Sequence, residues 1–181
     1  MNNHTLNLLL VEDSEDDVFL MSRALRKAGL SVHLQIAVDG QEALDYLQGA
    51  GKYADRTAFP LPDIVFLDLK LPYVHGFDVL AWLRQQAAFS ELAVAVLTSS
   101  PLDRDRERAQ ELGANAYLVK PPDGEMLLEV LRSVKQSASA VCEAAPLMAD
   151  ELRLVLAVPE HAAATPCFAI IGPQRASRTQ Y

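Results

Sequence analysis

The chain has 181 residues, a length that suits one domain with an additional segment or two small domains. Its 24 acidic and 16 basic residues give a net charge of −8, which argues against nucleic acid as the main partner because binding phosphates requires a basic face. Half of the residues are hydrophobic and 22% are charged, so we expect a folded chain with a sizeable core.

The sequence also indicates where the protein works. Its apolar runs are shorter than the roughly 20 residues that cross a bilayer, and residues 1–5 lack the basic start and long apolar stretch of a secretory signal. The cysteines, Cys142 and Cys167, form no CxxC pair, so we expect neither a disulfide framework nor a zinc site. We therefore expect a cytoplasmic protein with no membrane partner.

Short apolar runs alternate with amphipathic segments in the first half of the chain. Ser14 is suited to cap a helix, with acidic residues at its positive end, and Gly29 is suited to end it. Asp39 is suited to cap a second, shorter helix, and a long loop with glycines and prolines follows it. The predicted strands span residues 6–11, 32–38 and 63–67, and the predicted helices span residues 14–28 and 39–47.

The alternation continues in the second half. Pro72 and Gly76 mark a turn, and Gly113 closes a highly charged helix. The predicted strands span residues 92–97 and 116–119, and the predicted helices span residues 77–88, 103–112 and 123–135. Five strands alternating with five helices predict an α/β fold, a doubly wound parallel sheet covered on both faces. Such sheets carry their chemistry beyond the carboxyl ends of the strands.

The remaining segment differs in composition. We divide the chain into a domain at 1–136 and an extension at 137–181, which is rich in alanine and holds four of the ten prolines. Its apolar stretches at 152–158 and 167–171 are too few to bury a core alone. Two interpretations stay open: a partly ordered appendage, or an arm that packs on this domain or on a second protomer.

Reactive side chains follow four of the five predicted strands. Three carboxylates that meet at one edge of the sheet repel one another unless a cation lies among them, and Mg²⁺ suits such oxygen ligands. A carboxylate beside Mg²⁺ can attack phosphorus, while a hydroxyl and an ammonium group can bind phosphoryl oxygens. Each residue alone is usually a cap or a surface residue, but the set is much more specific: Glu12, Asp13, Asp68, Thr98 and Lys120.

These residues lie within stretches that resemble the receiver domain of two-component response regulators. The resemblance covers about residues 6–135 and rests on residues 9–13, 66–72 with Gly76, 97–99 and 113–121. It implies a flavodoxin-like fold with strand order 2-1-3-4-5. It also implies that Asp68 accepts a phosphoryl group from a sensor histidine kinase, and that Glu12, Asp13, Asp68 and the backbone carbonyl of Lys70 bind Mg²⁺.

The resemblance further implies roles in switching. Thr98 and Lys120 would hold the phosphoryl oxygens, and Tyr117 would change rotamer when Thr98 moves. The change would reach the face formed by the fourth helix, fifth strand and fifth helix. Family receivers also commonly have a cis bond before the proline matching Pro121. The kinase would dock near the first helix, where Phe19, Leu20 and Leu25 are candidate contacts.

A narrower resemblance concerns residues 12–17 and the long loop at 51–63. Both are similar to stand-alone regulators paired with bacterial phytochrome kinases, a group that often forms homodimers. This implies a single-domain regulator that catalyses only its own phosphorylation and dephosphorylation and is not a conventional enzyme.

Other functions fit the residues less well. An aspartyl-phosphate phosphatase would need a second Asp where Lys70 stands. A nucleotide-binding domain would need a glycine-rich loop after the first strand, where residues 11–17 contain no glycine. A receiver-like binding scaffold that is never phosphorylated remains the alternative.

Overall fold

The computed structural model describes residues 5–99 and 102–143, and the burial of side chains within them as far as residue 134. The expected strand-like stretches at 152–158 and 167–171 lie outside the described residues. Within residues 5–99 and 102–143, no helix is long and apolar enough to cross a membrane.

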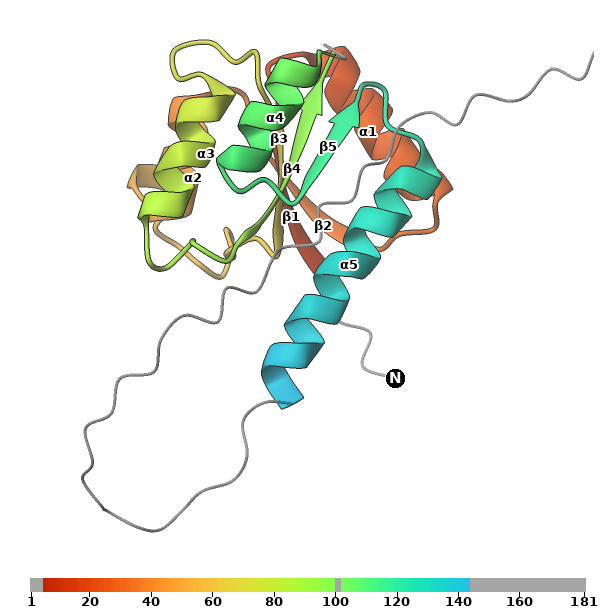
Figure 1. The fold of residues 1–181 in the computed structure, drawn as a ribbon. Coiled ribbons are helices and arrows are strands. Elements are labelled where there is room, and N and C mark those ends of the chain that lie inside the picture. The colour runs from red at the N-terminus through yellow and green to blue at the C-terminus, as the bar shows by residue number, and fades with distance from the viewer. Residues whose placement is uncertain (1–4, 100–101, 144–181) are drawn as a thin grey trace, which may run out of the picture.

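A five-stranded parallel sheet forms the centre of the fold, with the predicted order β2-β1-β3-β4-β5 (Figure 1). Its strands are β1 (Leu6–Val11), β2 (Val32–Ala37), β3 (Ile64–Asp68), β4 (Ala93–Thr98) and β5 (Ala116–Val119). The helices are α1 (Glu15–Lys27), α2 (Gly40–Gln48), α3 (Gly76–Gln85), α4 (Asp103–Glu111) and α5 (Gly124–Glu143). The doubly wound fold class is thus confirmed.

Helices cover both faces of the sheet, with α2, α3 and α4 on one side and α1 and α5 on the other (Figure 1). Alternate residues of each strand face opposite layers. Leu9, Val65 and Val96 belong to the core under α2–α4, whereas Leu8, Phe66 and Leu97 belong to the core under α1 and α5. Burial on both faces explains why the inner strands β1, β3 and β4 are almost continuously apolar, whereas the edge strand β2 also holds polar residues.

Helix α1 begins as the sequence predicted. The Ser14 hydroxyl accepts a hydrogen bond from the backbone N–H of Asp17 at 3.3 Å, and Gly29 follows the helix with φ +68°. Leu25 is buried in the core, so it is not an exposed kinase contact. Phe19 and Leu20, in contrast, are 58% and 41% exposed.

The long segment between α2 and β3 is fixed by contacts that the sequence did not predict. A short 3₁₀ helix forms at Gly51–Tyr53. The Arg56 guanidinium donates to the carbonyls of Tyr46 and Leu47, both at 2.8 Å, at the end of α2. The Tyr46 hydroxyl donates to the Pro60 carbonyl at 2.7 Å. Helix α5 also differs, because it continues to Glu143 rather than ending near Lys135.

Candidate functional site

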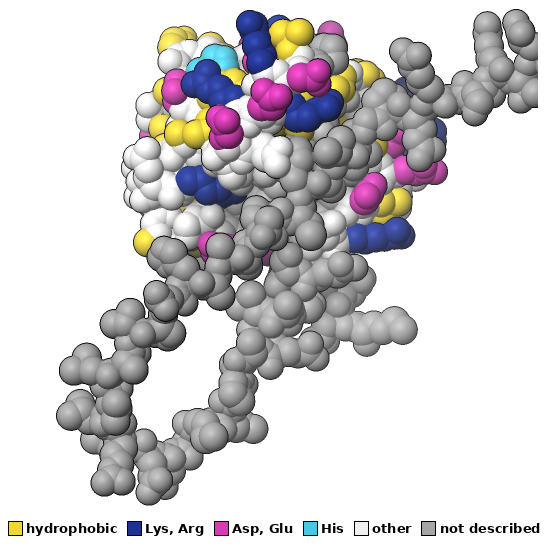
Figure 2. Space-filling model, viewed as in Figure 1, with side chains coloured by type: hydrophobic (Ala, Val, Ile, Leu, Met, Phe, Trp, Pro, Cys, Tyr) yellow, Lys and Arg dark blue, Asp and Glu magenta, His cyan; other side chains and the backbone are white. Residues whose placement is uncertain are grey.

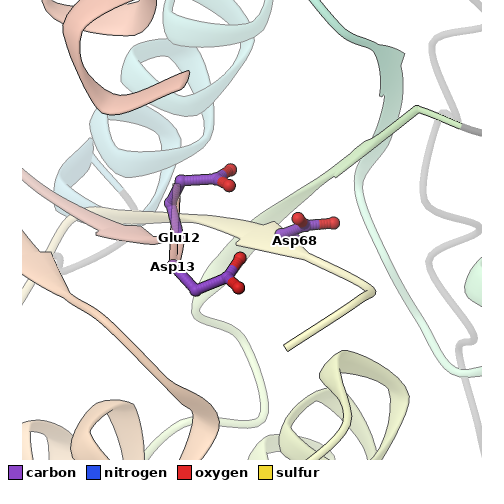
Figure 3. A group of neighbouring side chains, drawn as sticks. All are labelled: Glu12, Asp13 and Asp68. Carbon is purple, nitrogen blue, oxygen red and sulfur yellow. The ribbon is translucent and has the colours of Figure 1, made fainter. Parts of the chain in front are cut away.

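The carboxyl ends of the strands bring three acids together. In the strand register Val11 lies opposite Leu67, so Glu12 and Asp13 emerge beside Asp68, the last residue of β3. One carboxylate oxygen from each acid lies within 4.8 Å of the other two, and the three side chains lie together at the carboxyl ends of β1 and β3 (Figure 3). Glu12 and Asp68 are buried, whereas Asp13 is exposed. The site therefore opens to solvent at Asp13.

Lys120 reaches this cluster from the end of β5. Its ammonium nitrogen lies 2.5 Å from Glu12 Oε2, 2.7 Å from Asp68 Oδ2 and 3.0 Å from Asp17 Oδ2. The peptide bond between Lys120 and Pro121 is cis, as the resemblance implied. The ammonium donates hydrogen bonds to Asp68 Oδ2 and Asp17 Oδ2, whereas Glu12 Oε2 is buried beside it as an ion-pair partner without a hydrogen bond of good geometry.

Burial and charge set the protonation of this group of residues. Burial raises the pKa of Glu12 above its ordinary value, and the neighbouring carboxylates of Asp68 and Asp17 add to the rise despite the Lys120 ammonium. Burial alone would lower the pKa of Lys120, but its bonds to the three carboxylates outweigh that effect and raise it. Lys120 therefore stays positively charged over the physiological range.

The backbone around Asp68 fits closely against α3. The N–H of Lys70 donates to Asp68 Oδ1 at 3.1 Å, which fixes the direction of the carboxylate. A Cβ atom at Gly76 would lie 2.1 Å from the Asp68 carbonyl oxygen and 2.8 Å from the Leu69 Cα. Only glycine leaves room for that approach, so the sequence signal at Gly76 reflects close packing of α3 beneath the site.

Thr98 and Tyr117 lie on the neighbouring strands. Thr98 ends β4, is 1% exposed and pairs in register with Val119. The side chains of Tyr117 and Thr98 are hydrogen-bonded, and burial raises the pKa of the Tyr117 phenol. The guanidinium of Arg106, on α4, lies over the Tyr117 ring at 5.6 Å from its centre. A continuous set of contacts thus runs from the sheet edge to α4.

Two features of the site were not predicted. The sequence assigned Asp17 only to the positive end of α1, yet its carboxylate contacts Lys120. His75 is exposed and also caps α3, since its Nδ1 accepts a hydrogen bond from the N–H of Phe77 at 3.3 Å. The sequence does place Asp17 at the third position of a helix. An acidic residue there usually takes part in capping the helix, so its contact with Lys120 could not be inferred from that position.

The acidic cluster fits a divalent cation. Carboxylate oxygens are the ligands that hard divalent ions prefer, and three of them converge here from two adjacent strands. A cation would also offset the repulsion between the carboxylates, which adds to the effect of burial in raising the pKa of Glu12. The residues present therefore suit the metal that the sequence predicted, without distinguishing Mg²⁺ from other hard divalent ions.

Comparison with known proteins agrees with this geometry. The family model of the response regulator receiver domain matches residues 8–132. The probable methanogenesis regulatory protein FilR2 of Methanothrix harundinacea is 36% identical over 132 residues, which cover 71% of this chain and 81% of that protein. The bacteriophytochrome response regulator AtBRR has a solved structure that is 38% identical, with a TM-score of 0.66, covering 73% of this chain and 94% of that one.

A further structure bears on the metal. The Mn²⁺-bound form of the response regulator Rcp1, a Synechocystis protein, is 33% identical, with a TM-score of 0.59, and covers 80% of this chain and 99% of that chain. The family match, the identities and the acid cluster lead to one conclusion: the chain belongs to the response regulator receiver domain family of two-component systems.

Proposed function

We propose that the protein is a single-domain response regulator that takes a phosphoryl group onto Asp68 from a sensor histidine kinase, with Mg²⁺ bound by Glu12, Asp13, Asp68 and the Lys70 carbonyl. One observation carries the proposal. The buried Asp68 carboxylate lies between two further acids and the Lys120 ammonium, which is 2.7 Å from its Oδ2. This combines a nucleophile, a cation site and a positive charge for the incoming oxygens.

The transfer then follows from the residues present. An oxygen of Asp68 attacks phosphorus, the new O–P bond forms, and the P–N bond of the phosphohistidine donor breaks. The histidine nitrogen leaves with the electron pair of that bond and is free to take a proton. Bound Mg²⁺ would neutralise charge on the transferring group. Lys120 and Thr98 bind phosphoryl oxygens, and the N–H of Lys70 keeps the Asp68 carboxylate aligned.

We further propose that phosphorylation is read out on the α4-β5-α5 face. A phosphoryl group adds about −1.5 to −2 charges, which draw the Thr98 hydroxyl towards it. Tyr117 is hydrogen-bonded to Thr98 and is 3% exposed, so a displacement of Thr98 alters its environment. Arg106 then transmits the change to α4, where acidic and basic side chains are interspersed on the surface (Figure 2). We propose that a second copy of the chain docks on this face.

The proposed kinase is of the phytochrome type, and its docking surface includes the exposed Phe19 and Leu20 of α1. The similarity to a bacteriophytochrome response regulator supports this partner.

We also propose a cytoplasmic location, and a boundary at residue 136 between the receiver domain and the extension. Catalysis is confined to the protein's own phosphorylation and dephosphorylation.

Phosphotransfer tests the function directly. Candidate histidine kinases are labelled with ³²P and mixed with the full chain and with Asp68→Asn, in Mg²⁺ and in EDTA. We expect label only on the wild-type protein in Mg²⁺. Equal labelling of both proteins would show that Asp68 is not the acceptor. A wild-type protein that takes no label from any kinase or from acetyl phosphate would favour the unphosphorylated scaffold.

A further inference from the structure

Asp17 is the third partner of Lys120, and it stands outside the group of acids that fits a cation. Its Oδ2 lies 3.0 Å from the ammonium nitrogen. Glu12 and Asp68 also contact Lys120, but both belong to the set of converging oxygens that a metal ion would share. Asp17 is therefore the partner of Lys120 that cation binding and phosphorylation of Asp68 leave untouched.

The position of Asp17 in α1 has an ordinary explanation that the contacts contradict. Asp17 is the third residue of α1, where an acidic side chain commonly reaches back to the N–H of the capping residue. Here the N–H of the cap, Ser14, donates instead to Glu12 Oε1 at 3.4 Å. The carboxylate of Asp17 contacts Lys120, while its backbone N–H donates a hydrogen bond to the Ser14 hydroxyl that caps α1. The side chain is thus part of the site, whereas the backbone N–H takes part in capping the helix.

Lys120 has to exchange partners during the proposed reaction. Before transfer, its ammonium is ion-paired with three carboxylates and donates hydrogen bonds to two of them, Asp17 and Asp68. Once Asp68 carries phosphorus, one of its oxygens is covalently bound, and Glu12 and Asp68 would also serve as ligands of a bound cation. A lysine left without a fixed partner regains the rotational freedom of its long side chain, which costs binding energy when it must be ordered again.

We propose that Asp17 is a positioning residue that holds the Lys120 ammonium against the phosphoryl oxygens while the other two carboxylates are occupied. This inference rests on the proposed function. Asp17 acts only through Lys120 and does not itself contact phosphorus. Its side chain is 36% exposed, so its ion pair is partly screened, and we expect a moderate rather than an absolute effect.

The test uses beryllofluoride, which mimics a phosphoryl group on Asp68, with the full chain in Mg²⁺ and ¹⁹F NMR to measure its dissociation constant. Asp16→Asn is the matched control, because Asp16 is exposed in the same first turn and its loss removes the same charge without touching Lys120. We expect Asp17→Asn to weaken binding about fivefold relative to Asp16→Asn, the effect of a moderate ion pair. Asp17→Glu, which keeps a carboxylate, should recover part of the loss.

A double-mutant cycle separates positioning from a general effect on the helix. In a Lys120→Met background, Asp17→Asn should change binding no more than Asp16→Asn does. In the protein without Mg²⁺ or beryllofluoride, the ammonium NMR signal of Lys120 should shift in Asp17→Asn and not in Asp16→Asn.

Two results would overturn the inference alone: equal affinities for Asp17→Asn and Asp16→Asn, or an Asp17 effect that persists without Lys120. Failure of the wild-type protein to bind beryllofluoride, or equal binding by Asp68→Asn, would overturn the proposed function and this inference with it.

Discussion

Glu12 and Lys120 form an ion pair of 2.5 Å although they follow strands, β1 and β5, that are not neighbours in the sheet. Lys120 spans the edge of β3 and β4 to reach Glu12, and both side chains are largely removed from solvent. The ion pair thus crosses the carboxyl edge of the sheet, where Asp68 lies. Each of its two buried charges is compensated by the other.

We expect Lys120→Met to destabilise the fold by roughly 2–3 kcal/mol at pH 8, because it leaves Glu12 buried without a counter-charge. The folded-state pKa of Glu12 is already raised by burial, so the folded protein binds a proton more tightly than the unfolded chain. Stability linked to Glu12 is therefore present at low pH and is lost as the pH rises through that raised pKa. The deficit of Lys120→Met should shrink as the pH falls from 8 to 5.

Urea unfolding across this pH range measures the effect. Lys70→Met serves as the control, since Lys70 is exposed and the same atoms are removed. A deficit that is constant with pH would mean that Glu12 does not respond to the loss of Lys120.

Glu42 should give the opposite pH dependence. Burial favours its neutral form, but hydrogen bonds from Lys52, from the Val38 N–H and from the Tyr53 hydroxyl outweigh burial and lower the pKa of Glu42 to about 2. Because this folded-state pKa lies below the unfolded value of 4.5, the stability from Glu42 is present above pH 4.5 and is lost as the pH falls towards 2.

We expect Glu42→Gln to cost about 1 kcal/mol at pH 7, a value reduced by solvent screening of the exposed Lys52, and to approach the wild type near pH 2–3. Thermal unfolding in a pH series would detect this convergence, with the exposed Glu107→Gln as the control. A loss of stability in Glu42→Gln that grows as the pH falls would contradict a stabilising role for the charged Glu42 carboxylate.

The sheet and most of the site could be predicted from the sequence. Strands buried on both faces have a distinctive apolar pattern, and the carboxyl ends of parallel strands lie at the same edge of the sheet. Glu12, Asp68 and Lys120 could be placed from that rule alone. Asp17 could not, since its contact with Lys120 depends on how α1 is tilted over the sheet, which no local pattern encodes. The Arg56 bonds that fix the loop after α2 were missed for the same reason: they join a side chain to carbonyls ten and nine residues away.

Gly76→Ala tests how closely α3 is packed beneath the acceptor. The added methyl would meet the Asp68 carbonyl oxygen at 2.1 Å, and backbone cannot yield as a flexible side chain can. We expect a loss of roughly 2–3 kcal/mol in unfolding free energy and weaker divalent-ion binding, because the β3–α3 turn must shift. Gly124→Ala is the comparison, since the nearest atom to its methyl would be the Ala28 Cβ, at 3.3 Å. Similar losses in both variants would indicate that the effect is not specific to the site.

A substitution of Phe19 can distinguish docking of the kinase from the phosphorylation reaction at Asp68. This ring is 58% exposed on α1, the helix that also carries Asp17 beside the site, and an exposed aromatic residue is a common anchor of protein interfaces. Phe19→Ser should slow phosphotransfer from the cognate kinase about tenfold, within the range typical of truncating an interface anchor. Labelling by acetyl phosphate should not change, because a small donor needs no docking surface.

Leu61→Ser, at a position 51% exposed in the loop before β3, controls for the loss of surface apolar area. If Phe19→Ser slowed both donors equally, the residue would act on the phosphorylation site itself, and the docking surface would have to lie elsewhere on the domain.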